Sequence, residues 1–502
     1  MSFKLKTLVC LITLIASVAS AQLTPEFRME TELKDGYSNE KIYKSTMGYF
    51  VIQSEADKSG KTTKEIRYEL YDQALKEVKS ASVYVPIAMK TGLEFNDDKC
   101  IYKIFVNKSA AYVLYTITIE GLKIDSVKGN LPKNVILENM KIVNSKAWLQ
   151  ARQKKKTCIV QLDLQTGQTL ISECIEKEVG KKTSVVNYQF SPVSGELLVF
   201  VNKFIKKGVS ELSQMTVSGS CELCNHVQLT GTGDKVVSTV SGSRVAENEM
   251  VYTGTYSRSY IGYSEGLFFA KAVNNKMSYI KYINFLDMKK FLENKSELSQ
   301  KITKTVKKLY EKNGKELNIK YNVITHDIIV IPGGYLLIGE VYKPTYNTTS
   351  YPVTTFVNGM SMTRYQYSTV FAGYQYTHAF VAGFSNDGDL LWDQSFNMSP
   401  VERPYTPKKF IRISEKTDSH IALVYTSGGL IGSKIISFEG TVEKESTMDY
   451  IKSSNENEKA IYTTSGAEYW YDNYFLIYGS QSLKNKEEKS RRKVFFVNKV
   501  MF

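Results

Sequence analysis

Cys221, Cys224 and His226 form the densest group of side chains that could bind a metal or carry redox chemistry. A structural zinc site needs four ligands, and only three lie together here, so a fourth such as Glu222 would have to be recruited. A redox-active Cys-x-x-Cys pair normally begins a helix, whose dipole lowers the thiol pKa, but the flanking sequence is typical of strand and turn. We expect a local disulfide between the two cysteines, with metal binding or free, redox-active thiols as alternatives.

Cys158 and Cys174 flank a β-hairpin expected over residues 157–175. A three-residue loop with Gly167 in the left-handed conformation would place the two cysteines opposite each other. We therefore expect a cross-strand disulfide. The disulfide candidates are Cys158, Cys174, Cys221 and Cys224.

The other histidines, His326, His378 and His420, are isolated in the sequence, and no short motif joins any of them to a nucleophile. We expect them to be ordinary strand or loop residues. The sequence therefore predicts no catalytic residue, no metal site and no cofactor, and the chain is expected not to be an enzyme.

Aromatic side chains gather in residues 342–377, a segment rich in tyrosine and threonine without an apolar period. Tyrosine offers a large contact area at low entropic cost and keeps a polar tip, which suits protein or glycan partners. The alternative is a solvated ribbon whose tyrosines pack on each other. The predicted contact residues are Tyr346, Tyr351, Tyr365, Tyr367, Tyr374 and Tyr376.

Residues 1–21 have the composition of a cleavable signal peptide. Two lysines precede a short apolar run, and Ala19-Ser20-Ala21 supplies the small residues of a cleavage site before Gln22. The run is shorter than the roughly 20 residues that span a bilayer. No later segment is long and apolar enough, so we expect an exported mature chain with no transmembrane helix, in the periplasm, at the outer membrane or outside the cell.

The chain carries a formal net charge of +14, spread over many lysines with short clusters such as Lys154-Lys155-Lys156. Nucleic-acid-binding surfaces usually concentrate arginine between aromatic residues. That pattern is missing and export argues against it too, so no nucleic-acid partner is expected. Attraction to anionic glycans or lipid head groups stays open beside a merely solvated basic surface.

A repeat becomes visible when polar hairpin turns, rather than strands, are aligned. Successive turn centres are about 45 to 56 residues apart, except for one interval of about 113 residues between Asn275 and Gly388. Such a period is typical of propeller blades. Strands such as 196–201 and 335–339 are apolar on both faces and must be covered on both sides. The C-terminal run 493–502 is expected to pair with N-terminal strands and close the ring.

Two insertions account for the long interval. Residues 284–315 contain an amphipathic helix, with a stripe of Leu298, Ile302, Val306 and Leu309 and lysines on the other side. We expect this helix to lie against the outer edge of a blade, with a membrane-surface helix as the alternative. The second insertion, 342–377, is expected to be a long protruding β-ribbon or loop.

Three stretches in the middle third of the chain resemble a pattern found in uncharacterised exported bacterial β-propeller proteins. They are 252–257 with 264–269, then 327–330 leading into 333–340, and 380–384 followed by Asp387-Gly388 and Leu391-Trp392. The resemblance implies a propeller of the cell envelope and transfers no catalytic residue.

The expected protein is all-β, a single β-propeller domain over residues 22–502 with about seven or eight blades, one helical insertion and one Tyr/Thr-rich loop insertion. Its expected function is a non-catalytic scaffold that binds an envelope protein or glycan. One alternative is an outer-membrane β-barrel, which the tyrosine content and the C-terminal Phe502 would favour. The other is a propeller hydrolase acting in the central funnel, which would need a cluster of carboxylates there.

Overall fold

A computed structural model describes residues 24–33, 37–56, 62–180, 183–191, 196–206, 209–229, 235–258, 262–358, 360–398, 400–415, 419–449 and 453–502. The signal peptide expected at residues 1–21 lies outside these described residues. The described helices do not include one that is long and apolar enough to cross a membrane.

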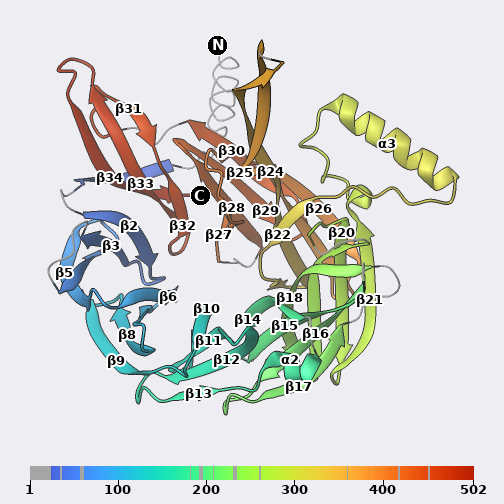
Figure 1. Cartoon of the computed structure of the whole chain (residues 1–502), viewed down its shortest axis with the longest axis horizontal. Helices are drawn as coiled ribbons and strands as arrows, with labels where there is room; N and C mark the ends of the chain where they lie inside the picture. Colours follow the sequence, from blue (N-terminus) through green and yellow to red (C-terminus); the bar gives the residue numbers. More distant parts are fainter. Residues whose placement is uncertain are drawn as a thin grey trace, which may run out of the picture.

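The described residues form eight antiparallel sheets, here called blades 1 to 8, which follow one another around a ring (Figure 1). Blade 1 contains β2 Tyr37–Lys44, β3 Phe50–Ala56, β4 Thr63–Tyr71 and β5 Glu77–Pro86, and blade 2 contains β6 Lys90–Asn96, β7 Cys100–Val106, β8 Ala111–Thr118 and β9 Lys123–Asn130. Blade 3 contains β10 Val135–Val143, β11 Lys146–Gln153, β12 Lys156–Asp163 and β13 Thr169–Ile171. Blade 4 contains β14 Thr183–Phe190, β15 Leu197–Lys206, β16 Val209–Val217 and β17 Leu223–Leu229. Consecutive strands pair within each blade, so the repeat seen in the turns is a repeat of four-stranded sheets.

The remaining blades carry the insertions and the ring closure. Blade 5 contains β18 Val236–Ala246, β19 Glu249–Ser257, β20 Gly266–Val273 and β21 Lys276–Asn284; blade 6 contains β22 Asn322–Thr325, β23 Ile329–Ile331, β24 Gly334–Val357, β25 Met360–Ser385 and β26 Leu390–Asn397; blade 7 contains β27 Arg412–Ile413, β28 His420–Ser427, β29 Leu430–Ser437 and β30 Val442–Asp449; and blade 8 contains β31 Glu458–Thr463, β32 Gly466–Tyr469, β33 Tyr474–Asn485, β34 Arg491–Met501 and β1 Thr24–Glu32. The prediction of an all-β propeller is confirmed, with eight blades. The 113-residue interval holds one blade, not two, because both insertions fall within it.

Strands that are apolar on both faces serve two different cores. On β15, Leu198 and Phe200 enter the apolar cluster shared with blade 5, while Val199 and Val201 enter the cluster shared with blade 3. Among the described residues, eight such clusters lie between successive blades, the last of them joining blade 8 to blade 1. The core is thus distributed around the ring, as radial packing of twisted sheets requires.

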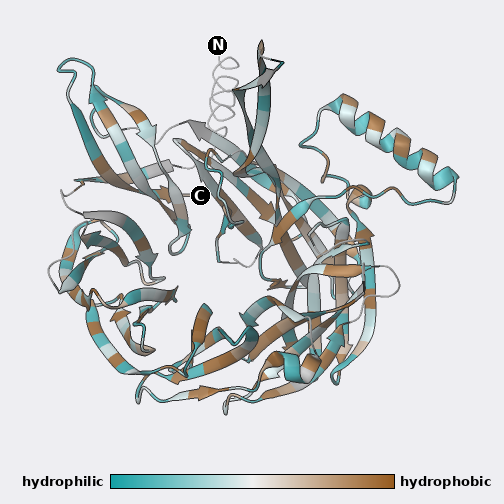
Figure 2. Cartoon of the chain, in the orientation of Figure 1, coloured by the Kyte–Doolittle hydropathy of each residue, from teal (hydrophilic) through white to brown (hydrophobic). Residues whose placement is uncertain are grey.

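The helical insertion differs from its prediction. Helix α3 spans only Glu297–Lys312, after the short 3-10 helix η1 Phe285–Asp287, because Phe291 and its neighbours leave the helical path and pack into the core between blades 5 and 6. No residue of α3 is buried, and the helix lies outside the ring (Figure 1), with apolar and polar segments alternating along it (Figure 2). The expectation that its apolar stripe rests against a blade edge is therefore wrong for Leu298, Ile302 and Leu309, which are exposed, while Val306 is half-buried.

The ring closes through a strand from each end of the chain. β1 pairs with β34 from Thr24 opposite Met501 to Glu32 opposite Val494, which confirms the expected closure. Closure gives β34 a partner on both sides, and β1 becomes an edge strand of the completed blade.

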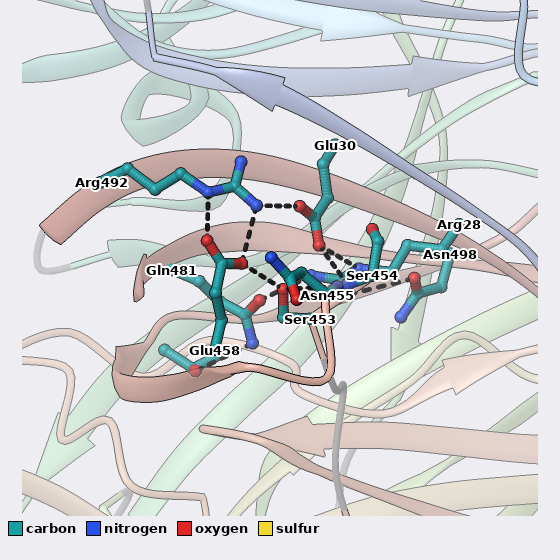
Figure 3. A network of polar contacts seen from close by, with 10 residues as sticks. Arg28, Glu30, Ser453, Ser454, Asn455, Glu458, Gln481, Arg492 and Asn498 are labelled. Atoms are coloured by element: carbon teal, nitrogen blue, oxygen red, sulfur yellow. Dashed lines mark hydrogen bonds and ion pairs between the residues drawn. The ribbon is translucent and has the colours of Figure 1, made fainter. Parts of the chain in front are cut away.

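A polar network fastens this last blade (Figure 3). The Glu30 carboxylate accepts hydrogen bonds from Arg28 Nε, Arg492 Nη2 and the Ser454 backbone N–H, each at 2.8 Å. Arg492 also donates to Glu458 at 2.6 and 2.8 Å. Burial alone would raise the pKa of Glu30, but the Ser454 and Arg28 hydrogen bonds outweigh it and lower that pKa to about 2. The carboxylate therefore stays ionised and joins strands from both chain ends.

Candidate functional site: an aromatic ribbon

The candidate site is built by β24 and β25, which contain 24 and 26 residues, far more than the other strands of the ring. Near the ring, β22, β23 and β26 flank the hairpin and make it part of blade 6. Beyond Tyr342 on β24 and before His378 on β25 the two strands pair only with each other, as far as Val357 opposite Met360. We call residues 342–377 the ribbon; it projects from the ring in Figure 1.

The register of the ribbon sorts its aromatic residues by face. Directly opposed residues of antiparallel strands share a face, and alternate positions switch faces. Tyr346 lies opposite Phe371, Ser350 opposite Tyr367 and Pro352 opposite Tyr365, at even-numbered positions of β24. Tyr346, Tyr365, Tyr367 and Phe371 therefore share one face, which we call the aromatic face.

Threonine pairs confirm which side chains share that face. The hydroxyl oxygens of Thr348 and Thr369 are 3.3 Å apart, and those of Thr354 and Thr363 are 3.2 Å apart. Thr348 and Thr354 occupy even-numbered positions of β24, and Thr369 and Thr363 are their directly opposed partners on β25. Threonines thus alternate with the aromatic residues and offer hydroxyl groups beside the rings.

Most of the aromatic face is open to contact. Tyr365 is 65% and Tyr367 71% exposed, and Tyr346 is also exposed while its ring packs edge-on against Phe371 at 5.9 Å. Tyr351 lies exposed on the opposite face, across from Gln366. Side chains two positions apart on a strand are about 7 Å apart, so Tyr365 and Tyr367 form adjacent platforms.

The two remaining predicted contact residues lie at the base of the ribbon. Tyr376 is buried; its hydroxyl donates to the Lys408 carbonyl at 2.6 Å and accepts from the Lys408 N–H at 2.9 Å. Tyr374 is half-buried, and its ring packs edge-on against Tyr342 at 5.1 Å. These two tyrosines hold the ribbon on the propeller instead of facing outward.

A buried carboxylate beneath the ribbon joins blades 6 and 7. Glu340 on β24 accepts hydrogen bonds from the Phe410 N–H at 2.9 Å and the Ile411 N–H at 3.0 Å. His326 Nε2 lies 2.8 Å from the same carboxylate. The ribbon therefore rises from a base whose backbone is fixed on both sides, which preorganises the aromatic face.

The charge on the ribbon is purely positive. Residues 342–377 include Lys343 and Arg364 and contain no aspartate or glutamate. Pro344 and Pro352 both lie on β24 and lack the backbone N–H that a further strand would need. At the edge of β24, contact through side chains is therefore favoured over the addition of a partner strand.

The first predicted disulfide is not present. Asp163 N–H bonds to the Gln168 carbonyl, so the hairpin loop contains four residues, 164–167, instead of three. With Val160 opposite Ile171, the register would place Glu173, not Cys174, opposite Cys158. The chain then enters helix α2 Ile175–Val179, and both cysteines are free.

The pair Cys221 and Cys224 is also free. Cys221 sits in a turn at φ 67° with its Sγ 3.5 Å from the Ile159 carbonyl, whereas Cys224 is the second residue of β17 and its Sγ contacts the Thr216 carbonyl at 3.3 Å. The two thiols thus bind to different partners. Burial raises the pKa of Cys221 to about 11 and also raises the pKa of Cys224, the reverse of what a redox-active thiol needs.

Metal-ligand clusters are also lacking in the described part of the chain: no three histidine, cysteine, aspartate or glutamate side chains gather in a metal-binding arrangement. His226 is exposed on β17 beside the two cysteines and supplies no third ligand. The alternative of a zinc site at this turn finds no support in its geometry.

One polar cluster was not predicted from the sequence. The buried ammonium of Lys103 on β7 lies 3.2 Å from Gln53 and Glu55 on blade 1 and 3.3 Å from Glu94 on blade 2. Tyr43 donates to Glu94 at 2.6 Å. The feature of the sequence that could have indicated this cluster was the lysine inside the otherwise apolar strand 100–106. Because each charge is paired, the cluster is suited to fastening blades 1 and 2 together.

Comparison with known proteins finds only distant structural similarity. No family model matches it, and no curated protein matches it. Similar solved structures include the Dos1 propeller (9% identity, 95% of each chain, TM-score 0.43) and the WD40 domain of SCAP from fission yeast (9%, 96% of this chain and 98% of that chain, 0.39). Another is the β-propeller domain of the Trilobed protease from Pyrococcus furiosus (8%, 83% and 100%, 0.34). At these values no functional residue is transferred, and the fold assignment rests on the blades and clusters of the chain itself.

Proposed function

We propose that this chain is an exported, non-catalytic β-propeller scaffold that binds a protein or a glycan of the cell envelope through the aromatic face of the ribbon. The observation that carries the proposal is the shared orientation of Tyr346, Tyr365 and Tyr367, which are exposed together on one face of a two-stranded ribbon. Such tyrosines lose little side-chain entropy on binding and are enriched at interaction hot spots.

The surroundings of these tyrosines fit either kind of envelope partner. Sugar rings stack on aromatic faces and bond to neighbouring hydroxyl groups, which Thr348 and Thr369 offer on the same face. A protein would bury the same rings in a pocket. The positive charge of Lys343 and Arg364 favours a partner with an acidic surface in both cases.

Export is the second part of the proposal and is supported by the composition of residues 1–21. Cleavage after Ala21 would release the mature chain at Gln22, into the periplasm or beyond it to the outer membrane or the cell exterior. Amino-terminal sequencing of the protein isolated from its own cells tests this step, and a chain that retains Met1 to Ala21 would contradict it.

Binding is tested by placing a photoreactive phenylalanine analogue at position 367 or at position 351 in separate chains. We expect cross-links to a protein, or to isolated envelope glycan, from position 367 and markedly fewer from position 351, because the two side chains occupy opposite faces. Equal cross-linking from both positions would contradict a specific aromatic face.

The partner found in this way is then titrated with purified variants. Removing two hot-spot tyrosines costs about 1 to 2 kcal/mol each, so Tyr365→Ser combined with Tyr367→Ser should weaken binding about 30- to 1000-fold. Tyr351→Ser is the matched control and should change the affinity less than about threefold. Unchanged binding by the double variant would exclude the aromatic face as the contact surface.

A further inference from the structure

Helix α3 is held at both ends by the propeller. On its N-terminal side, Phe285, Met288 and Phe291 are buried between blades 5 and 6, and the Phe285 and Phe291 rings stack at 4.2 Å. On its C-terminal side, Glu316 pairs with Arg258, and Tyr321 exchanges two backbone hydrogen bonds with Ser264. The position of the helix is therefore set by the fold and is not that of a loose tail.

The helix is also complete in itself. The Ser296 hydroxyl accepts a hydrogen bond from the Ser299 N–H at its N-terminus, and Asn313 and Gly314 end it, the latter at φ 64°. It spans 16 residues and contains no buried residue. Tertiary packing normally stabilises a helix of this length through its apolar face, but here most of that face is exposed.

Three of the four residues of the apolar stripe point away from the propeller, whereas the fourth, Val306, is half-buried. Leu298, Ile302 and Leu309 are 69%, 55% and 58% exposed. Lys307 is the residue of α3 that reaches back to the ring: its ammonium lies 2.6 Å from Asp287 and 3.1 Å from the Leu286 carbonyl. At about 100° per residue, Lys307 stands on the opposite side of the helix from the centre of the stripe. The tether therefore turns the stripe outward.

Positive charge borders the stripe. By the same helical geometry, Lys301, Lys308 and Lys312 project from one flank of it, Glu297 lies beside Lys308 at the outer margin of that flank, and Glu311 lies on the far side of the helix. α3 holds five lysines against these two glutamates. An exposed apolar stripe with lysines at its border fits a surface that is apolar beneath and anionic at its boundary.

We propose that α3 docks the propeller on the surface of a bilayer that contains anionic lipid, with Leu298, Ile302 and Leu309 inserted among the acyl chains. The lysines would then extend their alkyl chains along the interface and place their ammonium groups at the head groups. Charge complementarity selects this occupant, because a groove on a protein partner would match the stripe without needing the border of lysines. The inference is independent of the ribbon and of its partner.

The test is flotation of the purified full-length mature chain with vesicles of phosphatidylglycerol and phosphatidylcholine in equal parts, compared with phosphatidylcholine alone. We expect at least tenfold stronger partitioning to the anionic vesicles and a decline with added salt, since head-group attraction is screened. Equal partitioning to the two vesicle types, or none to either, would overturn the proposal.

Two triple variants separate the two forces. Leu298→Ser, Ile302→Ser and Leu309→Ser together should lower partitioning at least tenfold, and Lys301→Gln, Lys308→Gln and Lys312→Gln together should lower it similarly and flatten the salt dependence. The fold should survive because none of these residues is buried, which circular dichroism of the full chain checks. If neither triple variant lowers partitioning, α3 is not the membrane contact.

Matched controls exclude non-specific effects. Lys154→Gln, Lys155→Gln and Lys156→Gln remove the same charge from an exposed turn of blade 3, and Ile136→Ser removes an exposed apolar side chain from β10. Both should leave partitioning unchanged, as should Tyr365→Ser combined with Tyr367→Ser. A loss of vesicle binding in the ribbon variant alone would assign the membrane contact to the ribbon and overturn the role of α3, whatever the outcome for the envelope partner.

Discussion

His378 shows how one residue near the helical insertion depends on pH. It is buried on β25, with its ring 5.1 Å from Phe291 and its Nδ1 3.0 Å from the Thr377 hydroxyl. Its Nε2 has no hydrogen-bond partner within the described residues. Burial, and to a lesser extent the charge of Lys295, lowers the pKa of His378 to about 4. The folded chain therefore keeps this imidazole neutral.

Acid should destabilise the protein through this residue. Below about pH 6.5 the unfolded chain takes up a proton that the folded chain does not accept until about pH 4. The free energy of unfolding should thus fall across this window, by up to about 3 kcal/mol from His378 alone. Urea unfolding at pH 7 and pH 4.5 should show a smaller loss for His378→Phe than for the wild type.

The control for this measurement is His226→Gln, since His226 is exposed on β17. Its pH dependence should match that of the wild type. If His378→Phe also loses as much stability as the wild type between pH 7 and pH 4.5, the buried imidazole does not contribute to the acid sensitivity.

At the scale of elements, the ribbon can be removed without disturbing the buried contacts of the blade that carries it. Beyond its base the ribbon exposes most of its side chains, and the buried contacts of Tyr376 and Glu340 lie below that point. Replacing residues 347–370 by Asn-Gly would join Tyr346 to Phe371 through a two-residue turn that suits a hairpin. Little apolar burial is lost by this change.

We expect this shortened chain to fold, with a free energy of unfolding within about 1 kcal/mol of the wild type, because exposed side chains contribute little to stability. Its binding to the ribbon partner should disappear while its vesicle binding stays unchanged. Denaturant unfolding measures the first effect. A loss of several kcal/mol would mean that the ribbon is part of the folded core instead of a contact element.

For the whole molecule, stability depends on keeping the two chain ends together. Glu30 on β1 is surrounded by Arg28, Arg492 and the Ser454 N–H, all at 2.8 Å. Glu30→Gln would leave these donors without a charged acceptor and should cost about 3 kcal/mol at pH 7. Thermal and urea unfolding measure this loss, and Glu487→Gln in the exposed turn between β33 and β34 is the control.

The same variant has a defined pH response. The pKa of Glu30 is lowered from 4.5 to about 2 in the fold, so its stabilising contribution is complete above pH 4.5 and is lost as the pH falls towards 2. The difference between wild type and Glu30→Gln should therefore shrink below about pH 4. A difference that stays constant down to pH 2.5 would mean that the charge of Glu30 does not secure the closure.

Several features of the fold could be predicted because they are local. Turn residues such as Gly167 and Asn275 do adopt positive φ, and their spacing marks the blades. Strand 335–339 is apolar throughout because Tyr335 and Leu337 face blade 5 while Leu336 and Ile338 face blade 7. The candidate site was predicted only in part, since no sequence signal distinguishes the exposed Tyr367 from the buried Tyr376.

The sequence by itself determined the all-β class, the blade repeat and the two insertions, because turn conformations and alternating burial depend on neighbouring residues in the chain. The tertiary structure alone decided how distant groups meet. It shifted the hairpin register by one residue and separated Cys158 from Cys174, brought Lys103 to Glu55 across two blades, and tied Lys307 to Asp287 so that the stripe of α3 faces outward. These outcomes depend on the packing of whole sheets, which no local pattern in the sequence encodes.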